Sequence, residues 1–191
     1  MAGLKLAIMY KWDAEKALEM IEREKITNFV GVPTQSWDLV NSPAFEKYDT
    51  SSLRAVGGGG APSPTSLVGK VNDKVKNGNP QLGYGMTETN AFGPAITGSD
   101  YLSHPTSTGR ATWPMIVEVR DENLKPVPTG QSGEIWFFGP MLIRGYWNRP
   151  DATAETIVDG WLRSGDLGRL DADGYVYVED RVKDMILRAG D

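Results

Sequence analysis

The sequence contains no cysteine and only one histidine, His104, among its 191 residues. The absence of cysteine excludes disulfides, thiolate metal sites and cysteine nucleophiles. A single histidine cannot form a histidine-based zinc site or a Ser-His-Asp triad within one chain, and His104 precedes a proline, which is typical of a loop.

The sequence also lacks a basic cluster and a long apolar run. The net charge is −5 and the isoelectric point is about 5.0, so a nucleic-acid groove is not expected. No apolar run reaches transmembrane length and the N-terminus shows no signal-peptide pattern, so we expect no membrane span and a reducing, cytoplasmic setting. A hydrophobic content of 40% is enough to bury a core.

The first half of the chain alternates between strand and helix patterns, which is typical of a parallel α/β sheet. The strands are predicted at 4–10, 26–32 and 53–56, and the helices after Asp13, at 36–41 and along Leu67, Val71 and Val75. Glycine-rich turns follow the last of these strands and also occupy residues 83–89. Open α/β sheets bind ligands at such turns, so the two turns could form one floor. We predict a partial α/β subdomain over residues 1–99.

After about residue 100 the pattern changes to short strand candidates separated by turns. They lie at 115–120, 134–138 and 175–179, and helical periodicity is nearly absent. We predict a small antiparallel, barrel-like subdomain over residues 100–180. The segment 171–174 (DADG) resembles the start of a calcium loop, but the spacing of its acidic residues favours a hairpin turn.

The stretch GYGMTET at 83–89 combines glycines, an aromatic ring, a hydroxyl and a carboxylate. Glycine lets backbone approach a ligand closely, and Tyr84 can lie flat on a planar heterocycle. Thr87 can donate to a phosphate oxygen, and Glu88 can hold a hard cation such as Mg²⁺. Taken alone, the stretch fits an ordinary polar turn equally well.

Six motifs occur together and in a fixed order along the chain. They are GGGGAP (57–62), GYGMTET (83–89), GEIWFFGP (133–140), RGYWNRPDATAE (144–155), GWLRSGDLG (160–168) and DRVKDMILRAG (180–190). In this order and spacing the sequence resembles, over essentially its whole length, the adenylate-forming superfamily of acyl-CoA synthetases, luciferases and peptide-synthetase adenylation domains.

The resemblance implies a set of residues that bind ATP or AMP. These are Gly60, Ala61, Pro62, Tyr84, Gly85, Met86, Thr87, Asp166, Val178 and Arg181. Residues 60–62 would run along the adenine edge while Tyr84 stacks on the adenine face, and Met86 would be a packing residue of the site. Asp166 would accept both ribose hydroxyls, a task that suits the two oxygens of a carboxylate.

The resemblance also implies the catalytic residues, a substrate pocket and a hinge. Thr87 would bind the α-phosphate and Glu88 the Mg²⁺, and Lys183 would lie at the hinge. The acyl pocket would be lined by Gly59, Gly85, Ala91 and Phe92. The small residues at 59 and 60 favour a bulky or long acyl group.

Several of these residues also have a plain structural interpretation. Asp166 could be an Asx-turn residue beside Gly165. Arg181 and Asp180 could be a surface ion pair, and Lys183 could be a solvated lysine.

Relatives of this kind are several hundred residues long, so the resemblance implies an internal fragment of a large N-terminal domain. We find neither the phosphate loop nor the C-terminal catalytic lysine that the resemblance implies, and residues 181–191 would form the hinge and begin a further domain. The complete enzyme would use ATP, Mg²⁺ and CoA to activate a carboxylic acid, which we expect to be fatty. The fragment itself is expected to be inactive and to self-associate. The alternatives are a peptide-synthetase adenylation domain and a nucleotide-binding module without chemistry.

Overall fold

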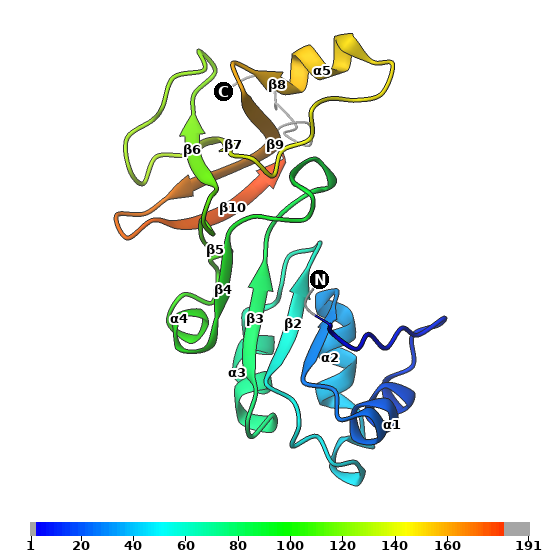
Figure 1. Ribbon diagram of the computed structural model, residues 1–191. Coiled ribbons are helices and arrows are strands. Elements are labelled where there is room, and N and C mark those ends of the chain that lie inside the picture. Colours follow the sequence, from blue (N-terminus) through cyan, green and yellow to red (C-terminus); the bar gives the residue numbers. More distant parts are fainter. Residues whose placement is uncertain (1–2, 182–191) are drawn as a thin grey trace, which may run out of the picture. The chain divides into compact units, whose positions relative to one another are not determined.

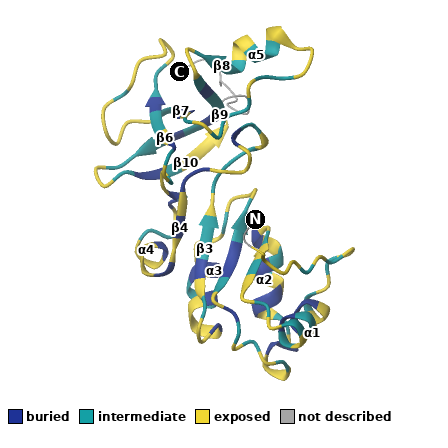
Figure 2. Cartoon of the chain, viewed as in Figure 1, coloured by how far each residue is buried: buried dark blue, intermediate teal, exposed yellow. Residues whose placement is uncertain are grey.

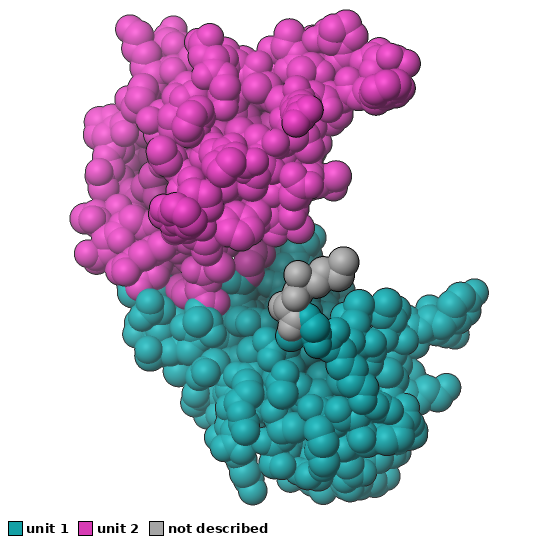
Figure 3. Space-filling model, in the orientation of Figure 1, with its two compact units in different colours: residues 1–82, 97–105 teal, residues 83–96, 106–191 magenta. Residues whose placement is uncertain are grey.

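The computed structural model describes residues 3–181, and the predicted hinge residue Lys183 lies outside them (Figure 1). The chain forms two compact units, which Figure 3 colours separately. Unit 1 comprises Met1–Leu82 and Thr97–Pro105, and unit 2 comprises Gly83–Ile96 and Thr106–Asp191. Each unit therefore takes two segments of the chain. No helix of the described residues is long and apolar enough to cross a membrane.

Unit 1 holds strands in the order β1-β2-β3, together with four α-helices. The strands are β1 (Asn28–Gly31), β2 (Ala55–Gly59) and β3 (Asn79–Gly83); the helices are α1 (Ala14–Glu24), α2 (Pro33–Asn41), α3 (Thr65–Lys74) and α4 (Gly98–Ser103), with a 3-10 turn, η1 (Phe45–Lys47). β1 and β2 pair in parallel, as the strand–helix pattern predicts. At Gly58 a Cβ would lie 1.8 Å from the carbonyl oxygen of Gly31, so this pairing requires glycine there.

Helices α1 and α3 form where capping and apolar spacing predict them, whereas α2 begins at Pro33, before the predicted residue 36, and α4 lies where no helix was predicted. Asp13 caps α1, its carboxylate accepting the Lys16 N–H at 3.0 Å. The buried faces of α1, α2 and α3 converge on one core (Figure 2). That core contains Ala17, Leu18, Ile21, Leu39, Val40, Phe45, Leu53, Val56, Leu67, Val71 and Val75. The predicted helical face of Leu67, Val71 and Val75 is confirmed.

The strand expected at residues 4–10 is a wrong prediction. The segment has no assigned strand, and Leu4, Leu6, Ile8 and Tyr10 are exposed. Their alternation is that of a strand, but among the described residues no neighbouring strand supplies the hydrogen-bonding partner that a strand needs. A hydrophobic pattern indicates which side chains could be buried, but it does not provide the neighbouring strand with which a strand must pair.

Unit 2 is a mostly antiparallel sheet in the order β4-β5-β10-β9-β7-β6, with β8 paired to β9. Its strands are β4 (Ala95–Thr97), β5 (Gly109–Arg110), β6 (Ile116–Arg120), β7 (Gly133–Phe138), β8 (Ile157–Val158), β9 (Trp161–Leu170) and β10 (Tyr175–Arg181). The antiparallel pairing is as predicted, but within the described residues the sheet is open and does not close into a barrel. The unit also contains α5 (Pro150–Thr156) and a 3-10 turn, η2 (Thr87–Thr89).

The core of unit 2 lies on β7, β9 and β10. Ile135, Phe137, Leu162 and Val176 are buried together, and Tyr84 and Met86 pack against them. The turn 171–174 joins β9 to β10, with the Asp171 carboxylate accepting two backbone N–H groups, so the hairpin prediction is confirmed. Because Tyr84 and Met86 pack against this core, the GYGMTET stretch is anchored on the sheet of unit 2.

Candidate functional site

The GYGMTET stretch folds into a tight turn that is held by its own hydrogen bonds. The buried Thr89 hydroxyl accepts the Met86 N–H at 3.1 Å and donates to the Met86 carbonyl at 3.0 Å. Asn90 and Ala91 both have left-handed backbone, with φ of 53° and 59°, and the Ala91 N–H returns to the Met86 carbonyl. This turn leaves Thr87 exposed and Glu88 half-buried.

Tyr84 and Asp166 meet although 82 residues separate them in the sequence. The Tyr84 hydroxyl donates to Asp166 Oδ2 at 2.6 Å. The tyrosine ring packs on Phe137 with centroids 5.6 Å apart, and Asp166 is only 8% exposed. Burial, aided by the hydrogen bond to Asp166, raises the pKa of Tyr84 far above its ordinary value. Tyr84 is therefore a neutral donor that fixes one carboxylate oxygen of Asp166.

The other oxygen of Asp166 faces Arg181. The two residues lie opposite each other in the β9–β10 pairing, and Arg181 Nε is 3.4 Å from Asp166 Oδ1. The sequence left open an ion pair between Arg181 and Asp180, but the Arg181 side chain pairs with Asp166 instead. The Asx turn considered for Asp166 is not what its side chain makes among the described residues, where the carboxylate contacts Tyr84 and Arg181 instead.

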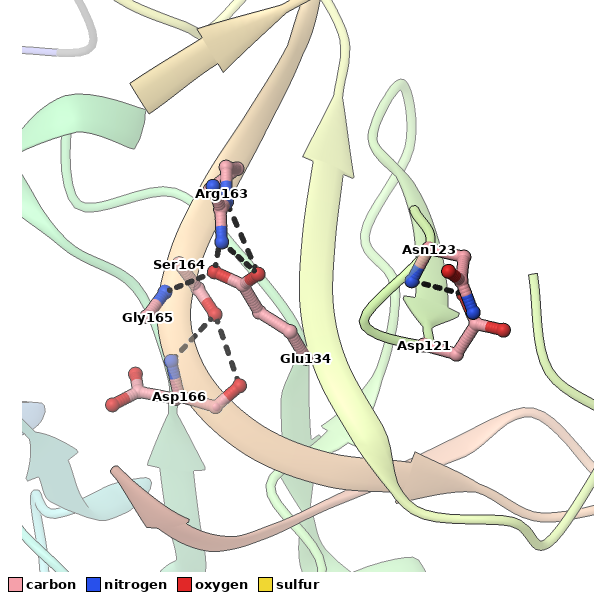
Figure 4. Close-up of polar contacts among 7 residues, drawn as sticks. All are labelled: Asp121, Asn123, Glu134, Arg163, Ser164, Gly165 and Asp166. Carbon is pink, nitrogen blue, oxygen red and sulfur yellow. Dashed lines mark hydrogen bonds and ion pairs between the residues drawn. The ribbon is translucent and has the colours of Figure 1, made fainter. Parts of the chain in front are cut away.

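A carboxylate that the sequence did not single out holds the irregular part of β9 just before Asp166. Glu134, whose side chain is 11% exposed, accepts from Arg163 Nη2 at 2.9 Å and from the Gly165 N–H at 3.1 Å (Figure 4). Gly165 has φ of +73°, so the chain bends here as glycine permits. Glu134 lies in the recognised GEIWFFGP motif, as the second residue of β7, the strand that pairs with β9.

Glu88 is contacted by a second residue that the sequence did not single out. The Tyr146 hydroxyl donates to Glu88 Oε1 at 2.6 Å, and the Ile143 N–H donates to the Glu88 carbonyl at 2.9 Å. The hydrogen bond to Glu88, followed by partial burial, raises the pKa of Tyr146. Tyr146 lies in the recognised RGYWNRPDATAE motif, but nothing in the pattern of that motif indicates that Tyr146 contacts Glu88.

The oxygen donors at this turn fit a hard divalent cation. Mg²⁺ is commonly held by one or two carboxylates together with substrate phosphates, and Glu88 with the exposed Thr87 hydroxyl offers such a partial set. Among the described residues there is no group of three or more histidine, aspartate or glutamate side chains that could hold a metal. Any cation here would therefore depend on a ligand for its remaining oxygens.

The remaining predicted residues divide between the two units. Gly59, Gly60, Ala61 and Pro62 lie in unit 1, at the end of β2 and in the exposed turn after it. Those in unit 2 are Tyr84, Gly85, Met86, Thr87, Glu88, Ala91, Phe92, Asp166, Val178 and Arg181. The structure brings Tyr84, Asp166 and Arg181 into one contact chain; that all of these residues converge on one nucleotide stays a prediction.

The chain is similar in sequence and structure to several known proteins. The family model described as AMP-binding enzyme matches residues 1–147. A feruloyl-CoA synthase from Amycolatopsis sp is 39% identical over 94% of this chain and 36% of its own length. A long-chain-fatty-acid–CoA ligase from Yersinia pestis is 37% identical over the whole chain and 34% of its own length. The amide bond synthetase McbA from Marinactinospora thermotolerans superposes with a TM-score of 0.85 at 36% identity, covering 92% of this chain and 36% of McbA. The chain thus spans about a third of the length of these relatives.

Proposed function

Since the chain belongs to the family of AMP-binding enzymes, we propose that it carries the nucleotide- and metal-binding residues of an ATP-dependent acyl-CoA ligase. The relatives that it matches include CoA ligases, which supports ligase chemistry. Because the chain spans only about a third of their length, the complete reaction belongs to the complete enzyme.

The observation that carries the proposal is the hydrogen bond between Tyr84 and Asp166. It joins two separate motifs, GYGMTET and GWLRSGDLG, at one point on the sheet of unit 2. Ionised carboxylate oxygens offer about four acceptor sites in total. Asp166 can therefore accept ribose hydroxyls while it keeps the Tyr84 contact, and Tyr84 offers a ring for the base.

Thr87 and Glu88 act at the phosphates in this proposal. The Thr87 hydroxyl donates to an α-phosphate oxygen, and the Glu88 carboxylate supplies an oxygen to Mg²⁺. When bound, Mg²⁺ offsets phosphate charge as a Lewis acid. Thr87 and Glu88 are adjacent in η2, so the contribution of the protein is to hold both groups in a fixed orientation.

The proposed reaction has two steps. A carboxylate oxygen of the acid attacks the α-phosphorus of ATP, the bond to the β-phosphate oxygen breaks, and pyrophosphate leaves. The thiol of CoA then attacks the acyl carbon of the acyl-adenylate, which expels AMP and transfers the thiol proton to the medium. Fatty acids are the proposed substrates, with Gly59, Gly85, Ala91 and Phe92 in the acyl pocket.

A second candidate function differs only in the molecule that accepts the acyl group. The similarity to the amide bond synthetase McbA favours an amine as the nucleophile that takes the acyl group from the adenylate. The similarity to feruloyl-CoA synthase likewise keeps aryl acids among the candidate substrates. Both alternatives leave the adenylation step and its residues unchanged.

The test is ATP–pyrophosphate exchange by the complete enzyme that contains this chain. Fatty, aryl and amino acids are compared, and the product is then identified with CoA or an amine as the acceptor. We expect exchange with fatty acids and a thioester product. Exchange that depends on amino acids would overturn the substrate class, and no exchange with any carboxylic acid would overturn the adenylation itself.

A further inference from the structure

Residues 141–146 form a short segment that contacts both the side chain and the backbone carbonyl of Glu88. The Tyr146 hydroxyl reaches the Glu88 carboxylate at 2.6 Å, and the Ile143 N–H reaches its carbonyl at 2.9 Å. In the same segment the Met141 carbonyl accepts from Asn90 Nδ2 at 2.7 Å. Three hydrogen bonds therefore join residues 141–146 to the turn that carries Thr87 and Glu88.

The segment is itself fixed by the start of α5. The Thr153 hydroxyl accepts the Tyr146 N–H at 2.9 Å and donates to the Arg149 carbonyl at 2.7 Å, while the Arg149 N–H donates to the Tyr146 carbonyl at 3.2 Å. Gly145 has φ of +152°, and a Cβ there would lie 2.8 Å from the Thr153 side chain. Glycine and threonine thus set the backbone from which Tyr146 projects.

Core packing accounts for Met141 and Leu142, which pack against the core of unit 2, but not for the placement of Tyr146. α5 contains no buried residue, and the side chain of Trp147, next to Tyr146, is 90% exposed. A surface helix that buries so little contributes little to the hydrophobic core. What the helix start does provide is a fixed Tyr146 hydroxyl beside the Glu88 carboxylate.

We propose that Tyr146 is a positioning residue that orients the Glu88 carboxylate toward a divalent cation, with Gly145 and Thr153 as its support. The inference rests on the metal role proposed for Glu88. A hydrogen bond to Oε1 restricts the side-chain rotamer of Glu88 and leaves Oε2 to contact the cation. Partners of metal-ligating carboxylates typically contribute 10- to 100-fold to metal affinity, so we expect a loss of about 10-fold without the Tyr146 hydroxyl.

The test uses the 191-residue chain with Mn²⁺ and ATP as the probe, followed by water-proton relaxation. The variants are Tyr146→Phe and Glu88→Gln. Tyr177→Phe is the matched control, because the Tyr177 hydroxyl makes the same kind of bond to Asp171, at 3.0 Å, elsewhere in unit 2. AMP affinity without metal and amide exchange at Ile143 are measured on all four proteins.

We expect Tyr146→Phe to weaken Mn²⁺ binding about 10-fold and to speed exchange at Ile143 several-fold, with AMP affinity unchanged. Tyr177→Phe should match the wild type. If Glu88→Gln abolishes Mn²⁺ binding and Tyr146→Phe does not weaken it, the positioning role is wrong and the metal role stands. Equal losses of Mn²⁺ and AMP affinity in Tyr146→Phe would show a general structural defect and overturn the inference. Mn²⁺ binding that is absent from the wild type, or unaffected by Glu88→Gln, would overturn the metal role and this inference with it.

Discussion

Replacing Tyr84 with phenylalanine removes one hydroxyl and leaves the ring on Phe137. The lost hydrogen bond is short, at 2.6 Å, and its acceptor is a carboxylate on a residue that is only 8% exposed. Hydrogen bonds to charged groups contribute about 1.5–3 kcal/mol. The remaining side-chain partner, Arg181, is exposed and 3.4 Å away, so it compensates little. We expect Tyr84→Phe to lower the free energy of unfolding of unit 2 by about 2 kcal/mol at pH 7.

The loss of unfolding free energy in Tyr84→Phe should depend on pH in a direction that follows from the raised pKa of Tyr84. The pKa of Tyr84 in the folded protein lies above the ordinary value of 10.0, so an unfolded chain gives up this proton first. The stabilisation by Tyr84 is therefore complete below about pH 10 and is lost as the pH rises toward the folded pKa, at about 1.4 kcal/mol per pH unit. The difference between wild type and Tyr84→Phe should vanish by roughly pH 11.5.

The assay is urea unfolding at several pH values, followed by the methyl resonances of Ile135, Leu162 and Val176. These residues form the core of unit 2 and report on it separately from unit 1, and methyl signals persist at high pH. The two proteins differ only at residue 84, so the difference between them isolates Tyr84. A variant as stable as the wild type at pH 7, or a difference that grows above pH 10, would refute the reasoning.

Three further predictions test other parts of the molecule. Glu134→Gln should destabilise unit 2 by about 1–2 kcal/mol, since a charge-assisted contact with the partly exposed Arg163 is lost; urea unfolding that shows no change would contradict this. Gly58→Ala should destabilise unit 1 by at least about 2 kcal/mol, whereas Gly69→Ala in α3, where a Cβ meets nothing within 4 Å, should stabilise it by about 0.5–1 kcal/mol; equal effects in thermal unfolding would count against the close-approach argument. The exposed apolar run at 4–10 should make the chain self-associate, so light scattering that finds only monomer at high concentration would disprove that expectation.

Sequence reasoning worked best where local rules decide the structure. The Asp13 cap, the helical face of α3 and the 171–174 turn each depend on residues a few positions apart, and each forms as predicted. It failed at residues 4–10, because a strand needs a partner that an alternating pattern cannot supply. The open sheet of unit 2 is a related case, since strand patterns do not specify closure.

The candidate site shows the same division. Motif order led to Tyr84 and Asp166, which the structure joins by a hydrogen bond. The supports of the site, Glu134 and Tyr146, lay inside recognised motifs and were missed. Their roles depend on contacts with residues 31 and 58 positions away in the sequence, and a single sequence does not show which distant residues will pair.

The central claim is that unit 2 recognises adenosine through Asp166 and Tyr84, and calorimetric titration of the chain with AMP tests it most directly. Asp166→Ala removes both ribose acceptors, and Asp173→Ala in the exposed 171–174 turn is the matched control. Two charge-assisted hydrogen bonds of about 1.5–3 kcal/mol each would be lost, so we predict weak AMP binding by the wild type and the control and none by Asp166→Ala. AMP binding that is unchanged in Asp166→Ala would contradict the account.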